Sequence, residues 1–313
     1  MTGDTAPEPI LTVHDIRRHF GGVKAVDGAS FTVRQGSITS LIGPNGAGKT
    51  TAFNLVTGFE QIDAGRVEFG GDDVTGLRAD QRARRGMVRT FQLTRVLGKM
   101  TVLDNVMLAA PDQPGERLRN ALRTGRWRGR EQEVREQALQ MLDDVGLRAK
   151  SDDYAATLSG GQRKLLEMGR ALMTRPSLVM LDEPMAGVNP TLGRQLLAYL
   201  DRLRVEEGLT VLFIEHDMDV VMDTSDEVIV MSEGRVLLQD TPEVVRRDQR
   251  VIDAYLGAGT ECANQPHCPT TARSCCRRRI LWAATSPRST FCAAATSPPP
   301  MARHARTGRA STL

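Results

Sequence analysis

The stretch that decides the fold is Gly43-Pro44-Asn45-Gly46-Ala47-Gly48-Lys49-Thr50-Thr51. It fits the pattern G-x-x-x-x-G-K-[ST], and it follows a predicted strand at residues 38–42 and precedes a helical pattern at residues 49–57. Phosphate groups need closely packed backbone N–H donors, and glycine at positions 46 and 48 removes side chains that would hold the backbone away. The helix start adds a favourable dipole. The stretch therefore predicts a phosphate-binding loop between a strand and a helix.

Within this loop, residues 43–51 form the predicted ATP-binding set. The Lys49 ammonium is placed to reach the β- and γ-phosphates of a nucleotide, and the Thr50 hydroxyl is placed to ligate Mg²⁺. An ordinary glycine-rich turn is the alternative. The strand before the loop and the helix after it favour the phosphate site.

Two carboxylates follow a second apolar strand, in Leu178-Val179-Met180-Leu181-Asp182-Glu183. Such a strand delivers them at its carboxyl end, the edge at which open α/β sheets bind ligands. We expect Asp182 to hold Mg²⁺ through its water shell. We expect Glu183 to orient and deprotonate an attacking water.

A second glycine-rich helix start is Leu158-Ser159-Gly160-Gly161-Gln162, which opens an expected helix over residues 163–173. Two glycines and a serine hydroxyl at a helix N-terminus again make an anion site. One nucleotide can use both phosphate-binding helix starts only if two molecules face each other.

This second motif, paired with the phosphate loop, resembles the signature of the ATP-binding cassette family. The resemblance implies further roles. Phe20 corresponds to an aromatic that stacks on adenine, with a plain core phenylalanine as the alternative. Gln92 corresponds to a glutamine that senses Mg²⁺ and the transporter, and His216 to a switch histidine at the γ-phosphate. Asn189, in Ala186-Gly187-Val188-Asn189-Pro190, lies in a loop that touches the opposite subunit, where many relatives have aspartate.

Several stretches resemble one subfamily, the LivG-like ATPase subunits of branched-chain amino acid importers. The resemblance covers about residues 10–257 and rests on Phe20-Gly21-Gly22, GMVRTFQ, KMTVLDNVMLA, residues 186–190, IEHDMDVVM and VIDAYLG. Some members of that subfamily have tyrosine where this chain has Gly160. Related cassettes for urea and other solutes share much of the pattern and stay open as alternatives.

The expected fold is an α/β protein with a P-loop NTPase (RecA-like) core, an N-terminal antiparallel β subdomain and an inserted α-helical signature subdomain at about residues 100–173. Short alternating runs at residues 10–34 predict antiparallel strands. Apolar runs at residues 178–181 and 210–214, separated by a helix at residues 190–207, predict a buried parallel sheet. A hairpin is expected at residues 227–239.

Smaller elements are expected around this core. Helices are predicted at residues 102–110, 131–145, from 218 onward, and from Pro242 to about Gly257, with Thr241 as the N-cap. The Pro-, Gly- and Arg-rich segment at residues 111–130 is a solvated insertion or, alternatively, a docking surface for an acidic or lipid partner.

Charge divides the chain into two parts. Residues 261–313 carry eight arginines and one acid, a net charge of +7, whereas the remainder carries −4. The mildly negative charge of residues 1–260 does not favour binding to nucleic acid. No uncharged apolar run reaches the about 18–20 residues of a membrane-spanning helix, and the first residues do not resemble a signal peptide. We therefore expect a cytoplasmic protein.

The segment 258–313 differs from the rest in composition. Its part beyond residue 260 lacks Val, Lys, Asp and Tyr and holds all five cysteines of the chain, Cys262, Cys268, Cys275, Cys276 and Cys292. We expect it to be disordered because it cannot bury enough apolar surface. An out-of-frame translation of G+C-rich DNA would give this composition, and a cysteine-rich metal segment is the alternative.

The resemblance implies a working assembly. Two copies, or this chain and a second ATPase subunit, would enclose two MgATP, with Lys49, Thr50 and Asp182 of one facing Ser159 and Gly161 of the other. Multi-helix permease subunits would hold the dimer on the inner face of the cell membrane, and a solute-binding protein would act indirectly. An exporter ATPase is one alternative. A soluble cassette acting on ribosomes or DNA is another, but it would usually carry tandem cassettes or a long coiled coil, and a GTPase would carry an Asn-Lys-x-Asp motif, which is missing from the sequence.

Overall fold

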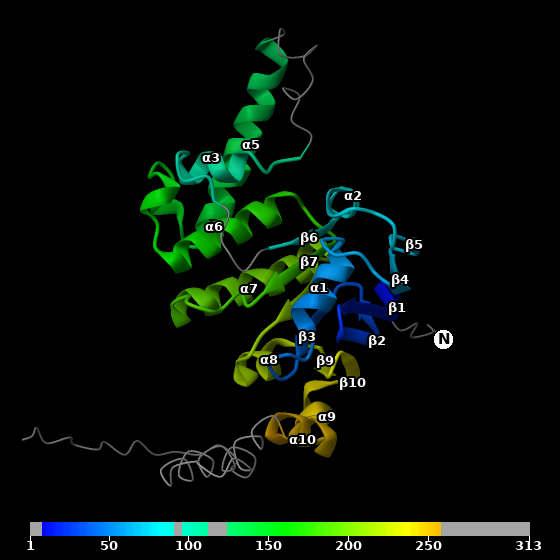
Figure 1. Ribbon diagram of the computed structural model, residues 1–313. Helices are drawn as coiled ribbons and strands as arrows, with labels where there is room; N and C mark the ends of the chain where they lie inside the picture. Colours follow the sequence, from blue (N-terminus) through cyan, green and yellow to red (C-terminus); the bar gives the residue numbers. More distant parts are fainter. Residues whose placement is uncertain (1–7, 91–95, 112–123, 258–313) are drawn as a thin grey trace, which may run out of the picture. The chain divides into compact units, whose positions relative to one another are not determined.

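The computed structural model describes residues 8–90, 96–111 and 124–257 (Figure 1). The chain divides into two units, residues 1–261 and 262–313, and all described residues belong to the first. The expectations for Gln92 and for the segment 258–313 therefore fall outside the described residues.

Strands make two separate sheets. They are β1 (Pro9–Phe20), β2 (Val23–Arg34), β3 (Ile38–Ile42), β4 (Ala64–Phe69), β5 (Asp72–Asp73), β6 (Met87–Arg89), β7 (Leu178–Asp182), β8 (Thr210–Ile214), β9 (Glu227–Ser232) and β10 (Arg235–Asp240). The first sheet has the order β2-β1-β4-β5 with antiparallel pairs, and the second has the order β10-β9-β3-β8-β7-β6. All neighbours in the second sheet are parallel except the β9–β10 hairpin.

Helices connect and cover the strands. They are α1 (Lys49–Thr57), α2 (Ala79–Ala83), α3 (Val102–Met107), α5 (Thr124–Asp144), α6 (Gly160–Met173), α7 (Pro190–Glu207), α8 (Met218–Thr224), α9 (Pro242–Arg247) and α10 (Gln249–Gly257), with short 3-10 turns at Arg148–Lys150 and Ala155–Thr157. The antiparallel N-terminal strands, the parallel core and the hairpin confirm the predicted fold class.

The parallel sheet is buried on both faces, which explains why its strands are mainly apolar. Side chains of β7 alternate between two core clusters: Val179 and Leu181 pack into one, and Leu178 and Met180 into the other. The first cluster takes in α3, α5, α6 and α7, and the second takes in α1 and the antiparallel sheet. Because successive strand side chains point to opposite faces, both sets of side chains in these strands are buried, and most of them are apolar.

The helical region contains α3, α5 and α6, drawn together above the sheets in Figure 1. Helix α3 ends three residues before the expected limit, and α5 begins seven residues before its expected start. Thr101 caps α3, since its hydroxyl accepts the N–H of Asp104 at 3.0 Å. The amide of Asn105 is fully buried, and it accepts the N–H of Leu97 and donates to the carbonyls of Leu97 and Thr101.

The prediction of one closing helix from Pro242 to about Gly257 is wrong. Two helices are present, and the chain is extended at Asp248 between them, with ψ 122°. The Asp248 carboxylate accepts the backbone N–H of Arg250 at 2.8 Å, so it serves the start of α10. Thr241 occupies the N-cap position of α9, but its side chain makes no capping hydrogen bond. A capping aspartate inside a helical pattern was the signal for the break.

Within the three described ranges, none of the helices combines the length and the apolar character that crossing a membrane requires.

Candidate functional site

The phosphate loop joins β3 to α1, as predicted, and backbone atoms of β2 and β9 pack against it. Gly48 has φ 94°, and a Cβ there would lie 2.3 Å from the Ala25 carbonyl oxygen on β2. At Gly43 a Cβ would lie 2.1 Å from the Met231 carbonyl oxygen on β9. Gly46 has φ 81° but no neighbour within 4 Å, so only its backbone conformation requires glycine. The loop is therefore fixed between the two sheets.

Lys49 opens α1 and is buried, with 7% exposure. Its ammonium donates to the carbonyls of Gly43 at 2.6 Å and Pro44 at 2.9 Å, so it lies across the loop. Burial lowers the pKa of Lys49, while the charges of Asp182 and Glu183 act in the opposite direction. The two predicted acids thus lie close enough to act on the predicted phosphate-binding lysine.

Asp182 ends β7, and its two carboxylate oxygens have different surroundings. Oδ2 accepts a hydrogen bond from Arg89 Nη2 at 2.9 Å. Oδ1 is buried and has no hydrogen-bond partner among the described residues. Burial raises the pKa of Asp182, and the Arg89 charge opposes that shift. The second oxygen is therefore available to a ligand.

These donors suit Mg²⁺. The cation binds oxygen ligands and commonly takes one or two carboxylates, with phosphates and waters completing its shell. Asp182 Oδ1 and the exposed hydroxyl of Thr50 supply that kind of oxygen. Over the described ranges there is no group of three or more His, Cys, Asp or Glu side chains that could hold an ion without phosphate.

Glu183 and His216, from different strands, are in direct contact. The His216 Nε2 atom lies 2.5 Å from Glu183 Oε1. The Glu183 N–H donates to the Ile214 carbonyl at 3.0 Å, which brings the end of β7 to the end of β8. Glu183 has φ 50°, a left-handed conformation that costs free energy in a residue with a Cβ.

Two side chains that the sequence did not reveal support this pair. Glu215 is buried, and its carboxylate accepts the backbone N–H groups of Met185 at 2.8 Å and His216 at 3.2 Å. Burial raises the pKa of Glu215. Lys164 of α6 donates to the carbonyls of Glu183 at 2.9 Å and Ala186 at 2.7 Å. An acid at the end of an apolar strand was the available signal for Glu215; Lys164 had none.

The signature motif lies at the start of α6, which begins at Gly160 rather than Arg163. Ser159 Oγ accepts the Gln162 N–H at 3.3 Å, and Gln162 Oε1 accepts the Ser159 N–H at 3.0 Å. This reciprocal cap fixes the start of α6, from Ser159 to Gln162, which we call the signature tip. It leaves the hydroxyl proton of Ser159 free to donate a hydrogen bond. Ser159 and Gly160 are exposed, Leu158 is buried, and a Cβ at Gly161 would lie 2.9 Å from the Gly187 carbonyl oxygen.

Phe20 and Asn189 also have defined positions. Phe20 ends β1 opposite Val23 and is 45% exposed, so its alternative reading as a core residue is wrong. The Arg18 guanidinium lies 4.8 Å from its ring centroid. Asn189 caps α7, since its side chain accepts the Thr191 N–H at 2.9 Å. Either asparagine or aspartate can make this cap, so Asn189 keeps the capping hydrogen bond that aspartate would make.

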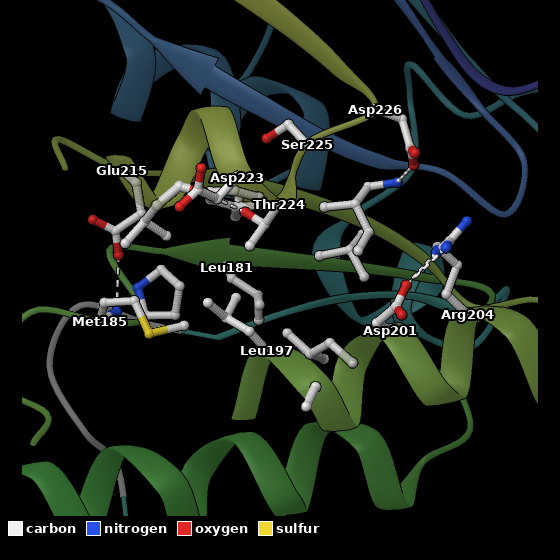
Figure 2. A pocket seen from close by; sticks show the side chains of 17 residues that line it. Leu181, Met185, Leu197, Asp201, Arg204, Glu215, Asp223, Thr224, Ser225 and Asp226 are labelled. Atoms are coloured by element: carbon white, nitrogen blue, oxygen red, sulfur yellow. Dashed lines mark hydrogen bonds and ion pairs between the residues drawn. The ribbon is translucent and has the colours of Figure 1, made fainter. Parts of the chain in front are cut away.

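A pocket of about 400 Å³ lies among β8, α7 and α8 and is shown in Figure 2. Glu215 and Met185 line one part of it, and the Asp201–Arg204 pair lines another. None of the residues 43–51 lines it, so it is not the phosphate site.

Comparison with known proteins identifies the family of the chain. The family model described as ABC transporter matches residues 26–186, and the one described as branched-chain amino acid ATP-binding cassette transporter matches residues 235–261. The chain is 42% identical over 250 residues to the high-affinity branched-chain amino acid transport ATP-binding protein BraF of Pseudomonas aeruginosa, covering 80% of this chain and 98% of that one.

It is 41% identical over 249 residues to the probable branched-chain amino acid transport ATP-binding protein LivG of Archaeoglobus fulgidus, covering 80% of this chain and 96% of that one. A solved structure of the ADP conformation of an ATP-binding cassette of an ABC transporter matches with a TM-score of 0.68 and 39% identity, covering 80% of this chain and 99% of that chain. The resemblance drawn from the sequence motifs is confirmed. The chain belongs to the ABC transporter family, whose ATPases hydrolyse ATP coupled to transport.

Proposed function

We propose that this chain is the ATP-hydrolysing subunit of an importer for branched-chain amino acids. Support for the solute comes from the similarity to BraF and LivG and from the match of residues 235–261 to the branched-chain amino acid cassette family. Support for the chemistry comes from one observation: Lys49, Asp182, Glu183 and His216 gather where β3, β7 and β8 end.

The nucleotide would bind across residues 43–51, with Phe20 stacked on the adenine. The hairpin turn after Phe20 leads into β2 at Val23. Two residues further along β2, Ala25 packs against Gly48, so Phe20 and the phosphate loop are connected through this short stretch. Lys49 would turn its ammonium from the loop carbonyls to the phosphates. Thr50, Asp182 and Gln92 would hold Mg²⁺, which neutralises phosphate charge when bound.

In the hydrolytic step Glu183 acts as general base. A water oxygen bonds to the γ-phosphorus as the bond to ADP breaks, and Glu183 takes the proton of that water. His216, now in contact with the Glu183 carboxylate, would support the γ-phosphate. Lys49 and the backbone N–H groups of the loop stabilise negative charge, so catalysis is mainly positioning and electrostatics.

A second subunit completes the site. Because Ser159 and Gly160 are exposed at the start of α6, they can face the nucleotide of another molecule. The loop that ends at Asn189 would touch that molecule too, since Gly187 lies against Gly161. We propose a homodimer or a heterodimer with a related ATPase, bound to permease subunits on the cytoplasmic face of the membrane. The cassette would span residues 10–257, with its helical subdomain at about residues 100–173. Disorder of the segment 258–313 stays a prediction.

The test is reconstitution with permease subunits that co-purify with this chain from its native membrane. Purified complex in vesicles should hydrolyse MgATP and take up leucine when the cognate solute-binding protein is present. Lys49→Ala should weaken ATP binding at least about tenfold, since a charged hydrogen bond contributes about 1.5–3 kcal/mol, and should abolish uptake. Transport of another solute class, or outward transport, would reject the branched-chain importer and retain the ATPase.

A further inference from the structure

Arg89 forms a buried ion pair with the carboxylate proposed to hold Mg²⁺. Its side chain is 6% exposed and that of Asp182 is 1% exposed, and Nη2 lies 2.9 Å from Oδ2. Two charges withdrawn from water this far depend on each other, because removal of either one leaves the other buried without compensation. Arg89 ends β6 and pairs with Met180 on β7, the strand that Asp182 ends.

The other arm of the same guanidinium reaches the phosphate-loop helix. Nη1 donates to Asn54 Oδ1 at 2.5 Å and lies 3.5 Å from Thr57 Oγ1, both on α1. The ring of Phe53, also on α1, lies 5.6 Å from the guanidinium carbon. A planar guanidinium holds two partners in fixed directions, which an ammonium cannot do. Arg89 therefore joins β7 to α1 through side chains.

From this geometry we propose that Arg89 is a positioning residue for Asp182, an inference that rests on the proposed function. By occupying Oδ2, it fixes the carboxylate plane and leaves Oδ1 as the oxygen without a partner. By binding Asn54 on α1, it sets the place of Asp182 relative to Thr50, the other proposed metal ligand on that helix. Groups that orient a metal ligand contribute about 10–100-fold to metal affinity.

Arg82 offers a matched control. It is 2% exposed and also contacts α1, donating to the carbonyls of Leu55 and Val56. Its remaining hydrogen bonds go to the carbonyls of Leu77 and Thr75, so in the described part of the chain its hydrogen-bond acceptors are backbone carbonyls and not carboxylates. Loss of Arg82 should therefore disturb packing near α1 without releasing Asp182.

The experiment compares Arg89→Lys and Arg82→Lys in a Glu183→Gln background. Trinitrophenyl-ATP is titrated by fluorescence in EDTA and again in excess Mn²⁺, and the ratio of the two affinities measures the contribution of the metal. We expect Arg89→Lys to reduce this ratio at least about tenfold and to leave the affinity in EDTA near that of the parent. Arg82→Lys should lower the melting temperature and keep the parental ratio.

Asn54→Ala provides a second variant that keeps the ion pair and removes its contact on α1. We expect its ratio to fall by about threefold or more, because the guanidinium loses one of its two fixed directions. A parental ratio in folded Arg89→Lys and Asn54→Ala would overturn the positioning role. A parent protein that binds trinitrophenyl-ATP equally well with and without Mn²⁺ would instead count against the metal site of the proposed function.

Discussion

Glu183 and His216 hold the most informative contact at the scale of single residues. Glu183 lies in a left-handed conformation and touches His216, which follows a different strand. The strain is compensated by the Ile214 carbonyl that accepts the Glu183 N–H and by Lys164 bound to its carbonyl. A carboxylate held in this way beside a phosphate loop is well placed to act on a water.

Replacing Glu183 with glutamine should lower the rate of phosphate release by about 10²–10⁴, because general base catalysis contributes that much. ATP binding should persist, since Lys49 and the loop are untouched. Steady-state phosphate release and nucleotide titration measure the two effects. Glu233→Gln is the control, because Glu233 has the same φ of 50° but is exposed in the β9–β10 turn. Wild-type hydrolysis by Glu183→Gln would remove this residue from the role of base.

Residue by residue, the sequence was informative where local pattern carries the chemistry. Lys49, Asp182 and Ser159 stand in motifs whose spacing implies their place in a strand–helix unit. Arg89 and Lys164 were not foreseen as partners of the site, because their contacts join segments far apart in the chain. Such pairings depend on tertiary packing, which hydrophobic period alone does not determine.

At the scale of elements, the phosphate loop requires glycine for two separable reasons. Gly46→Ala should cost about 1–2 kcal/mol of stability through its left-handed conformation alone. Gly48→Ala should cost more, because its Cβ would also lie 2.3 Å from the Ala25 carbonyl oxygen. Thermal unfolding of both variants measures the difference. Equal melting temperatures would show that β2 moves away from the added Cβ at little cost and does not fix the loop.

Substitutions at position 189 test whether the N-cap hydrogen bond stabilises the start of α7. Asn189→Ala should destabilise the protein by about 1 kcal/mol, since an N-cap hydrogen bond is lost. Asn189→Asp should retain stability, because aspartate caps equally well and favours the helix dipole. Urea unfolding of the two variants is the measurement. An alanine variant as stable as the parent would mean that the bond to the Thr191 N–H contributes nothing.

The elements themselves were predicted well where their pattern was strong. The strands β7 and β8 follow from apolar runs, β3 from its place before the phosphate loop, and α1 and α7 have the expected bounds. The break between α9 and α10 was missed because Asp248 interrupts the backbone without glycine or proline. The short α2 and β6 were missed too, since they carry too few residues for a period to show.

At the scale of the whole molecule, the site is divided between two places. Lys49 and Asp182 lie where strands of the parallel sheet end, while the signature tip begins α6 in the helical region (Figure 1). The tip is exposed, and its own side chains are already satisfied by the Ser159–Gln162 cap. In the proposed function a second subunit therefore brings such a tip to each nucleotide.

Light scattering on Glu183→Gln with and without MgATP tests this claim most directly. We predict a monomer without nucleotide, a dimer with MgATP, and loss of that dimer when Ser159→Arg is added, because a bulky cation at the tip would prevent close approach. Ser151→Arg, at the exit of a 3-10 turn, is the control and should still dimerise. A protein saturated with MgATP that stays monomeric, or a dimer indifferent to Ser159→Arg, would contradict the shared site.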